Sequence, residues 1–333
     1  ALRRAGLPAL AVVLLLWALS SLVEVASSRL GDPLATVVAA LASAAPTVTL
    51  LAVGVITLAA RRRSWAAIVI AALAGLLPWG FVGPYASSDD PPHAAGDTLL
   101  RVMLVNAHDG QASAPDIVAA TVGNDVDLLV VTELSGRLAH DLTVAGLDSA
   151  VGARWVRLPG QGGVAEDPEA GMGVWGRVAL DQARDLPGTQ WPALTARVTA
   201  GATRFTLVAG HVATPLPGGG HRWAEDLSTL RRAAGQIDGP KVLLANLNAT
   251  PWHADFRQFA DAGLRDAADV LGRGPRPTWP TWSPVALMSL DHAMVGGGIG
   301  VTSVETVVIG GSDHRGVIAG LRLPATAATA ATG

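Results

Sequence analysis

The sequence predicts an α/β chain in which three membrane-spanning helices precede a globular domain with a two-sheet core flanked by helices. Half of the 333 residues are hydrophobic and only 15% are charged, which is more apolar than an ordinary soluble domain. The long apolar stretches lie before residue 85. From residue 98 onward, short apolar runs alternate with polar turns, as expected for many strands with helices between some of them.

The predicted membrane helices cover residues 7–27, 34–60 and 64–84. Each is close to the ~20 residues that a helix needs to cross a bilayer. A cleaved signal peptide would account for the first segment but not for three in succession, and a soluble helical bundle is the alternative. The chain then divides into an anchor (1–85), a linker (86–97), a globular domain (98–323) and a low-complexity tail (324–333) that we expect to be disordered.

Basic residues predict the orientation of this anchor. Arg3 and Arg4 precede the first segment, and Arg61, Arg62 and Arg63 separate the second from the third. Such residues favour the cytoplasmic side of a membrane. Three crossings then place the globular domain outside, so we expect a multi-pass cell-membrane protein with an extracytoplasmic domain. The chain has no cysteine, which excludes disulfides and cysteine-bound metals.

Nine strands and three helices are predicted in the globular domain. The strands are residues 99–106, 127–132, 173–177, 194–199, 204–211, 241–246, 290–295, 300–308 and 316–323. A helix is expected to begin at Ser113-Ala114-Pro115-Asp116, which combines an N-cap serine with an early proline and acid. Two further helices are expected at residues 222–237 and 253–262.

Polar side chains recur where these strands begin or end. The residues in question are Asn106, Glu133, His211, Asn246 with Asn248, Asp291 with His292, and Asp313 with His314. Each has a simpler explanation when taken alone, since a lone asparagine at a strand end is usually a turn former. Together they indicate a functional site on one edge of the sheets.

Seven stretches carry a resemblance to a known family. They are LRVMLVNAHDG, DVDLLVVTEL, GMGVWGRV, VAGHVATP, VLLANLNATP, SLDHAMV and GSDHRGVIAGL. In order and spacing they resemble the motifs of the endonuclease/exonuclease/phosphatase superfamily, the DNase I-like hydrolases. This resemblance implies a four-layer α/β sandwich with two central, mainly antiparallel sheets. The N-terminal segments and the stretch ATPWHADF also resemble the membrane-anchored actinobacterial branch that includes VanJ-type teicoplanin-resistance proteins.

The resemblance implies hydrolysis of a phosphate ester with a divalent ion, Mg²⁺ or in its place Mn²⁺ or Ca²⁺. Such an ion neutralises the phosphate and prefers oxygen ligands. Glu133 is the expected metal carboxylate, with Asn106 and Asp313 assisting. Asp313 is also expected to orient His314, which would contact the phosphate or help to activate water.

Four other residues receive roles in the same way. His211 would be a second phosphate ligand or a general acid, and Asn248 would donate to the phosphoryl oxygens. Asp291 would orient other site residues or be structural, and Arg177 would face the phosphate or be structural.

Several further polar and aromatic residues are interpreted more simply. His108, Asp109, His221 and His253 could line the substrate entrance, but we expect most of them to be ordinary surface residues. We expect His292 to be a packing residue. The tryptophans Trp252, Trp279 and Trp282 could form an apolar wall near the site or be buried in the core.

Asn246 departs from the family pattern, which has aspartate in the motif Gly-Asp-Phe-Asn. That aspartate is expected to orient or deprotonate the attacking water, and a neutral amide cannot act as a base. Three explanations compete. The residue is a shape-preserving change that traps substrate, or a divergence that leaves residual activity through His314, or a sign that catalysis has been lost in favour of binding.

The charge of the globular domain bears on its substrate. From residue 98 onward, 18 Arg and Lys stand against 22 Asp and Glu, a net charge of −4. This balance disfavours a nucleic-acid partner, which calls for a basic surface. The first hypothesis is therefore a membrane-anchored phosphohydrolase of a lipid-linked phosphate such as polyprenyl (pyro)phosphate. The alternatives are an extracytoplasmic nuclease or phosphodiesterase and a catalytically silent binder of cell-wall lipid precursors. Protein partners are not predicted.

Overall fold

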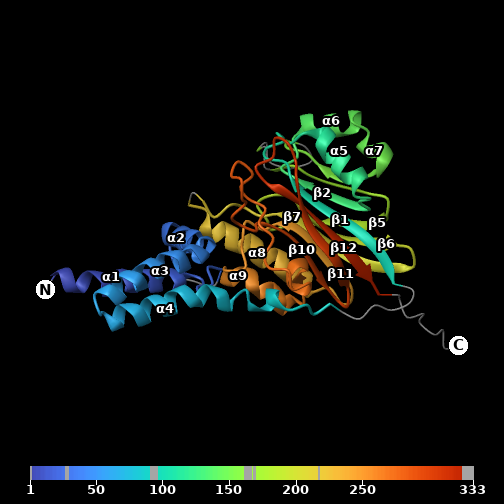
Figure 1. Ribbon diagram of the computed structural model, residues 1–333. Helices are drawn as coiled ribbons and strands as arrows, with labels where there is room; N and C mark the ends of the chain where they lie inside the picture. Colours follow the sequence, from blue (N-terminus) through green and yellow to red (C-terminus); the bar gives the residue numbers. More distant parts are fainter. Residues whose placement is uncertain are drawn as a thin grey trace.

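A computed structural model of the chain describes residues 2–26, 30–90, 97–160, 167, 170–216 and 218–324. Figure 1 shows three N-terminal helices extending from one side of a sandwich of sheets and helices. They are α1 (Leu2–Ser20), α3 (Ala45–Arg61) and α4 (Trp65–Gly80). A fourth, α2 (Asp32–Ser43), lies against the sandwich beside α8 (Gly220–Gly235). The linker prediction falls mostly on residues 91–96, and these, like almost all of the tail from 325 on, lie outside the described residues.

The second predicted membrane segment is not one helix. It is divided at Ala44 into α2 and α3, which are bent by 68° relative to each other. Pro46 lies in the first turn of α3, where its missing N–H is tolerated, and it could not continue α2 without removing a helix hydrogen bond. Of the helices that the structure describes, none taken singly has the length and apolar character to cross a bilayer; the bent pair passes this test together. The prediction of three single-helix spans is therefore not supported.

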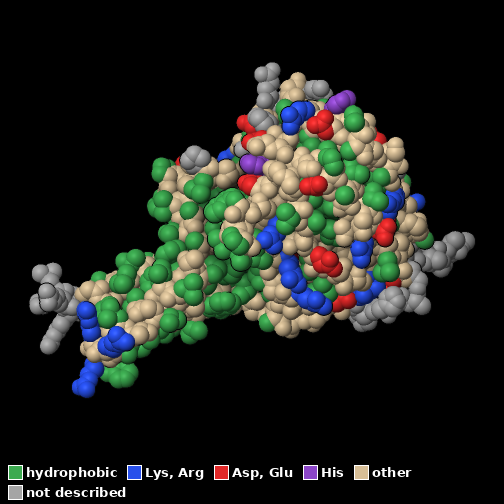
Figure 2. Space-filling model, turned by 45° about the horizontal axis from the view of Figure 1, so that its top comes forward, with side chains coloured by type: hydrophobic (Ala, Val, Ile, Leu, Met, Phe, Trp, Pro, Cys, Tyr) green, Lys and Arg blue, Asp and Glu red, His purple; other side chains and the backbone are tan. Residues whose placement is uncertain are grey.

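Small residues hold α1, α3 and α4 together. Their shared core is rich in buried alanines, such as Ala11, Ala52 and Ala71. Gly75 lies so close to α3 that an added Cβ would be 3.0 Å from the Ala52 Cβ. Such residues let helix backbones approach closely. Larger apolar side chains point outward and cover this arm, and basic side chains gather at its far end (Figure 2).

The globular domain contains two six-stranded sheets. The first has the order β11 (Gly300–Val308), β12 (Arg315–Leu323), β1 (Thr98–Asn106), β2 (Leu128–Thr132), β4 (Met172–Gly176) and β3 (Ala153–Arg157). The second has the order β5 (Ala179–Asp185), β6 (Ala193–Ala200), β7 (Thr203–His211), β8 (Lys241–Asn246), β10 (Asp291–Gly296) and β9 (Arg265–Asp266). Each sheet has one parallel pair at its centre, β1 with β2 and β7 with β8, and is otherwise antiparallel.

Alternation of side chains along the central strands produces the layers. In β1, Val102 and Leu104 face the core between the sheets, whereas Met103 and Val105 pack against α5 (Ala114–Gly123), α6 (Gly136–Val144) and α7 (Leu147–Ala150). In β8 the inner residues meet the same core, and the outer ones pack against α8 and the short helices α9 (Ala254–Arg257) and η3 (Gln258–Ala262). The predicted four-layer α/β sandwich is thus confirmed.

A short stretch after β8 attaches the N-terminal helices to the sandwich. Trp252 Nε1 donates to the Pro78 carbonyl at 2.9 Å. Asp255 accepts hydrogen bonds from the backbone N–H groups of Val25 and Ala26 at 2.9 and 3.0 Å. Its neighbours also take part: Arg257 Nη2 donates to the Ser21 carbonyl at 2.6 Å, and His253 Nε2 lies 3.0 Å from the Ala39 carbonyl. We call residues 252–257 the docking segment. His253 is therefore a buried residue of this segment and not an ordinary surface residue.

His253 should make stability depend on pH. Its Nδ1 accepts from the Thr250 N–H at 2.9 Å, so the imidazole is neutral with its proton on Nε2. Burial, which disfavours the charged ring, lowers the pKa of His253 from 6.5 to about 4. The unfolded chain therefore binds this proton first as the pH falls, and about 3 kcal/mol of stability present above pH 6.5 should be lost by about pH 4.

We expect chemical denaturation of the full chain in detergent to show this loss, and the His253→Gln variant to lack it. The stability difference between the two proteins should narrow as the pH is lowered from 7 to about 4. Parallel pH curves for the two proteins would contradict the prediction.

Candidate active site

The topology brings the predicted site residues to one edge of both sheets. The parallel strands β1 and β2 end together, with Asn106 paired to Thr132, and Glu133 follows. Strands β7 and β8 end together in the second sheet, with His211 paired to Asn246. Strands β10 and β12 are antiparallel to these central strands, so their amino ends, at Asp291 and just after His314, reach the same edge.

Glu133 is held at the centre of this edge. Its backbone has φ +54°, and its side chain is only 13% exposed. One carboxylate oxygen accepts from Asn106 Nδ2 at 2.6 Å and the other from the Asp109 N–H at 2.8 Å. His211 Nε2 lies 3.5 Å from the first of these oxygens. Asn106 is almost fully buried, its Oδ1 accepts from the His108 N–H at 2.8 Å, and its Nδ2 orients Glu133.

His314 is oriented by Asp291 and not, as expected, by Asp313. The His314 Nδ1 lies 2.6 Å from an Asp291 carboxylate oxygen, which also accepts from the Thr278 hydroxyl at 2.6 Å. The Asp313 carboxylate is 3.9 Å from the His314 Nε2, beyond hydrogen-bond reach. Burial alone would lower the pKa of His314, but the negative charges of Asp291, Asp313 and Glu133 and the hydrogen bond to Asp291 raise it to about 9. The ring is therefore an imidazolium at neutral pH, with Nε2 as its second donor.

The two amides after β8 differ in their surroundings. Asn246 is fully buried, and its Oδ1 accepts from the Asn248 N–H at 2.9 Å. Among the residues that the structure describes, its Nδ2 has no hydrogen-bond partner. Asn248 has φ +44°, and its Nδ2 donates to the Val212 carbonyl at 3.0 Å. The unpaired Nδ2 of Asn246 occupies the position that an aspartate would fill with its second carboxylate oxygen. The structure therefore leaves all three explanations of this residue open.

These side chains share a pocket of about 450 Å³. Glu133, His211, Asn248, Asp313 and His314 are among the residues that line it. The remaining lining residues are Ala40 and Ser43 of α2 and the loop residues Thr214, Pro215, Leu216, Trp279, Met288 and Leu290. The structure thus brings together all the predicted site residues except Arg177, with Asn106, Asn246 and Asp291 placed behind the residues that face the pocket.

Arg177 lies at the opposite end of the sheet. Strand β4 is antiparallel to β2, with Met172 beside Thr132 and Gly176 beside Leu128. Its carboxyl end, and the exposed Arg177 that follows, therefore point away from the edge that holds Glu133. The interpretation of Arg177 as a phosphate-facing residue is wrong for this reason.

His108 and Asp109, for which the sequence left open a place at the substrate entrance or on the surface, lie beside the site. His108 and Asp109 have φ of 49° and 54°, and with Gly110 at 74° they form a left-handed turn after β1. This turn directs the Asp109 N–H to Glu133 and places His108 Nδ1 3.9 Å from Asp313. Burial, and then the charge of Glu133, raise the pKa of Asp109. The two consecutive polar residues before Gly110, which begin two positions after Asn106, were the available signal in the sequence.

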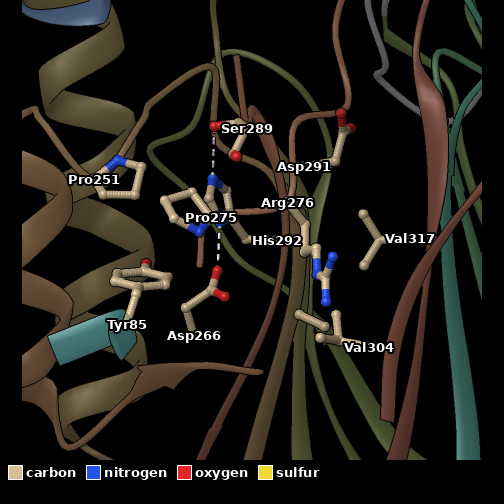
Figure 3. Close-up of a pocket in the computed structure, with 11 residues that line it drawn as sticks. Tyr85, Pro251, Asp266, Pro275, Arg276, Ser289, Asp291, His292, Val304 and Val317 are labelled. Carbon is tan, nitrogen blue, oxygen red and sulfur yellow. Dashed lines mark hydrogen bonds and ion pairs between the residues drawn. The ribbon is translucent and has the colours of Figure 1, made fainter. Parts of the chain in front are cut away.

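Aromatic residues fix other parts of the site. Trp279 lines the pocket and its Nε1 donates to Asp313 at 3.1 Å, whereas Trp282 is 75% exposed and not in the core. His292 is a packing residue, as predicted. Figure 3 shows its ring in a small enclosed pocket between Asp266 and Ser289, and its Nδ1 lies 2.6 Å from the Asp266 carboxylate.

The donor set suits a magnesium-type ion held by few protein oxygens. Within the described residues, no group of three or more His, Cys, Asp or Glu has the arrangement of a metal cage. Mg²⁺ keeps several waters and often takes only one or two carboxylates. Glu133 and Asp313 supply carboxylate oxygens on the wall of the same pocket. These residues therefore fit the ion that the sequence resemblance implies, and they are the two that would hold it.

The sequence of residues 87–314 matches the family model described as the endonuclease/exonuclease/phosphatase family. The chain belongs to this family. It is accordingly a phosphoesterase of the endonuclease/exonuclease/phosphatase type, and enzymes of this type use a divalent metal. No match is found among the curated proteins.

Solved structures agree with this fold. A humanized TDP2 from D. rerio is 15% identical with a TM-score of 0.55, over 67% of this chain and 98% of that one. The D. rerio TDP2 complexed with a single-strand DNA product is 16% identical with a TM-score of 0.54, over 68% and 99% of the two chains. A family member from Bacteroides vulgatus is 16% identical with a TM-score of 0.52, over 68% and 100%. At such identities the likeness concerns the fold alone.

Proposed function

We propose that the protein is a membrane-anchored, outward-facing, Mg²⁺-dependent phosphohydrolase that acts on a lipid-linked phosphate such as polyprenyl (pyro)phosphate. The observation that carries this proposal is the composition of the pocket. The carboxylates Glu133 and Asp313, which would hold the ion, and the donor His314 line the same cavity as residues of an N-terminal helix and apolar loop residues. The resemblance to VanJ-type teicoplanin-resistance proteins supports a role in cell-wall lipid metabolism and antibiotic resistance.

The exposed surface of the N-terminal helices supports membrane attachment. Of the 25 exposed large hydrophobic side chains in the described part of the chain, 17 belong to residues 1–85. A continuous apolar surface of this kind marks a membrane or protein contact. Arg61, Arg62 and Arg63 are exposed between α3 and α4, as expected for a cytoplasmic end of the anchor.

The site residues can bind and polarise a phosphate group. Asp291 fixes the His314 Nδ1, so the other ring nitrogen, Nε2, is free of that bond and belongs to the pocket wall, where it would donate to a phosphoryl oxygen. His211, stacked on Trp191 with ring centroids 6.4 Å apart, has a fixed ring plane beside Glu133. A bound divalent ion would supply charge neutralisation of the phosphate and a more acidic water.

Asn246→Asp is expected to raise kcat for phosphate release by about 10²-fold, because a carboxylate at this position can accept a proton from water. Its first oxygen keeps the hydrogen bond from the Asn248 N–H, and its second replaces the unpaired Nδ2. Adding Glu133→Ala to this variant should abolish the gain. An unchanged rate would show that the amide does not limit catalysis.

The function is tested by phosphate release from polyprenyl pyrophosphate in detergent with Mg²⁺, using the wild type and the Asn246→Asp variant in parallel with a DNA substrate. Release from the lipid in either form, dependent on Glu133, supports the proposal. DNA cleavage without lipid turnover would favour the extracytoplasmic nuclease, for which the DNA-bound TDP2 structure is the relevant likeness. Retained lipid binding without turnover in either form would favour the silent binder.

A further inference from the structure

The site pocket has a wall that the family resemblance does not explain. Helix α2 belongs to the N-terminal 85 residues, yet Ala40 and Ser43 line the same cavity as Glu133 and His314. The apolar side chains Pro215, Leu216, Met288 and Leu290 belong to the same lining. The N-terminal helices therefore contribute surface to the site itself.

Contacts near both ends hold α2 in this place. At its start, Asp32 accepts from the His221 N–H at 3.1 Å, and Thr36 Oγ1 accepts from the Gly220 N–H at 3.2 Å. A Cβ added to Gly220 would lie 2.6 Å from the Thr36 nitrogen, so only glycine permits this approach. At the other end, Ser43 Oγ lies 3.2 Å from His253 Nε2 of the docking segment. Helix α2 is thus held against the globular domain by specific contacts at both ends.

Exposed apolar side chains continue the wall to the surface. Val37, three residues before Ala40, lies beside it on the same face of α2 and is 50% exposed. Leu34, a further three residues back and displaced around the helix, is 52% exposed. On the loops that contribute lining residues, Leu216 and Leu287 are 49% and 62% exposed. Exposed apolar side chains therefore adjoin the lining residues Ala40 and Met288, and the lining residue Leu216 is itself exposed.

We propose that α2 and the loops around Leu216 and Met288 form a hydrocarbon subsite that selects phosphate substrates carrying an aliphatic chain. The phosphate would lie at Glu133 and His314, and the adjoining chain between Ala40 and Leu216. This inference rests on the proposed function, since it uses the same phosphate position. Ala40 determines the space available, because a larger side chain there would occupy the part of the pocket that the chain needs.

The test measures binding and does not require turnover. The full chain in detergent micelles with Mg²⁺ is titrated calorimetrically with octyl phosphate and with ethyl phosphate, and titrations into protein-free micelles are subtracted. We expect octyl phosphate to bind about tenfold more tightly than ethyl phosphate, since its extra methylenes leave water. Ala40→Trp should remove most of this preference and leave ethyl phosphate binding within about twofold.

Two further variants serve as a second test of the subsite and as a control. Leu216 is a half-exposed loop residue, so Leu216→Ser should fold normally. This variant should weaken octyl phosphate binding about threefold. Ala66→Trp, at an exposed position of α4 away from the pocket, should bind both phosphates as the wild type does. Equal affinity of the wild type for both compounds, or an undiminished preference in both Ala40→Trp and Leu216→Ser, would overturn the inference.

The outcome is separable from that of the proposed function. If polyprenyl pyrophosphate is hydrolysed but no chain-length preference is found, the function stands and the subsite is refuted. If the preference depends on Ala40 but no phosphate is released by the wild type or by Asn246→Asp, the subsite stands and the hydrolytic function is refuted.

Discussion

Replacing Glu133 by glutamine is expected to lower kcat/KM for phosphate release by about 10³-fold, since it removes the central carboxylate of the proposed metal site. The change preserves the shape of a side chain whose two oxygens accept from Asn106 and from the Asp109 N–H. It also removes the charge that both His211 and His314 face. The loss should appear in the wild type and, with a larger measurable range, in the Asn246→Asp background.

Binding of the metal itself gives a second readout for Glu133. Calorimetric titration of the full chain with Mg²⁺ or Mn²⁺ should show weaker binding in Glu133→Gln than in wild type. Glu305→Gln is the matched control, because Glu305 is an exposed glutamate on β11, remote from the pocket lining. If metal affinity and kcat/KM are unchanged in Glu133→Gln, then Glu133 is not a ligand of the metal.

Strands were predictable from the sequence wherever they are buried on both faces. The runs that became β1, β2, β7 and β8 are continuously apolar because each faces the inter-sheet core on one side and helices on the other. The edge strands β3, β5 and β9 were missed. Strand β5, with the sequence ALDQARD, is exposed along almost its whole length, so no apolar pattern marks it. Its pairing with β6 is a backbone property that its side chains do not encode.

Site residues were predictable where position along a strand decides them. Parallel strands whose carboxyl ends meet at one edge carry these residues: Asn106, His211 and Asn246 are the last residues of their strands, and Glu133 follows β2. Pairings between distant segments were not predictable. The partner of His314 is Asp291, 23 residues away in sequence, although Asp313 is its neighbour along the chain. Likewise, the contribution of α2 to the pocket depends on the break at Ala44 and on hydrogen bonds to residues about 190 to 210 positions away.

His314→Gln is expected to lower kcat/KM by about 10³-fold, and Asp291→Asn by about 10²-fold, since one removes a charged donor to the phosphate and the other its partner. The double variant should be no worse than His314→Gln alone, because Asp291 acts through the imidazole. Asp261→Asn, at an exposed position in η3, is the control and should be near wild type.

A pH readout separates this positioning role of Asp291 from a merely structural one. In the wild type, the charge of Asp291 and its hydrogen bond oppose the effect of burial and raise the pKa of His314, so the imidazolium and the activity that needs it should persist above neutral pH. In Asp291→Asn the burial of the ring dominates, and its pKa should fall, as an NMR titration of the imidazole would show. The rate of the variant should then decline at a lower pH than that of the wild type. Coincident pH–rate profiles, with the two imidazole titrations unchanged, would show that Asp291 supports the fold of this edge and not the charge of His314.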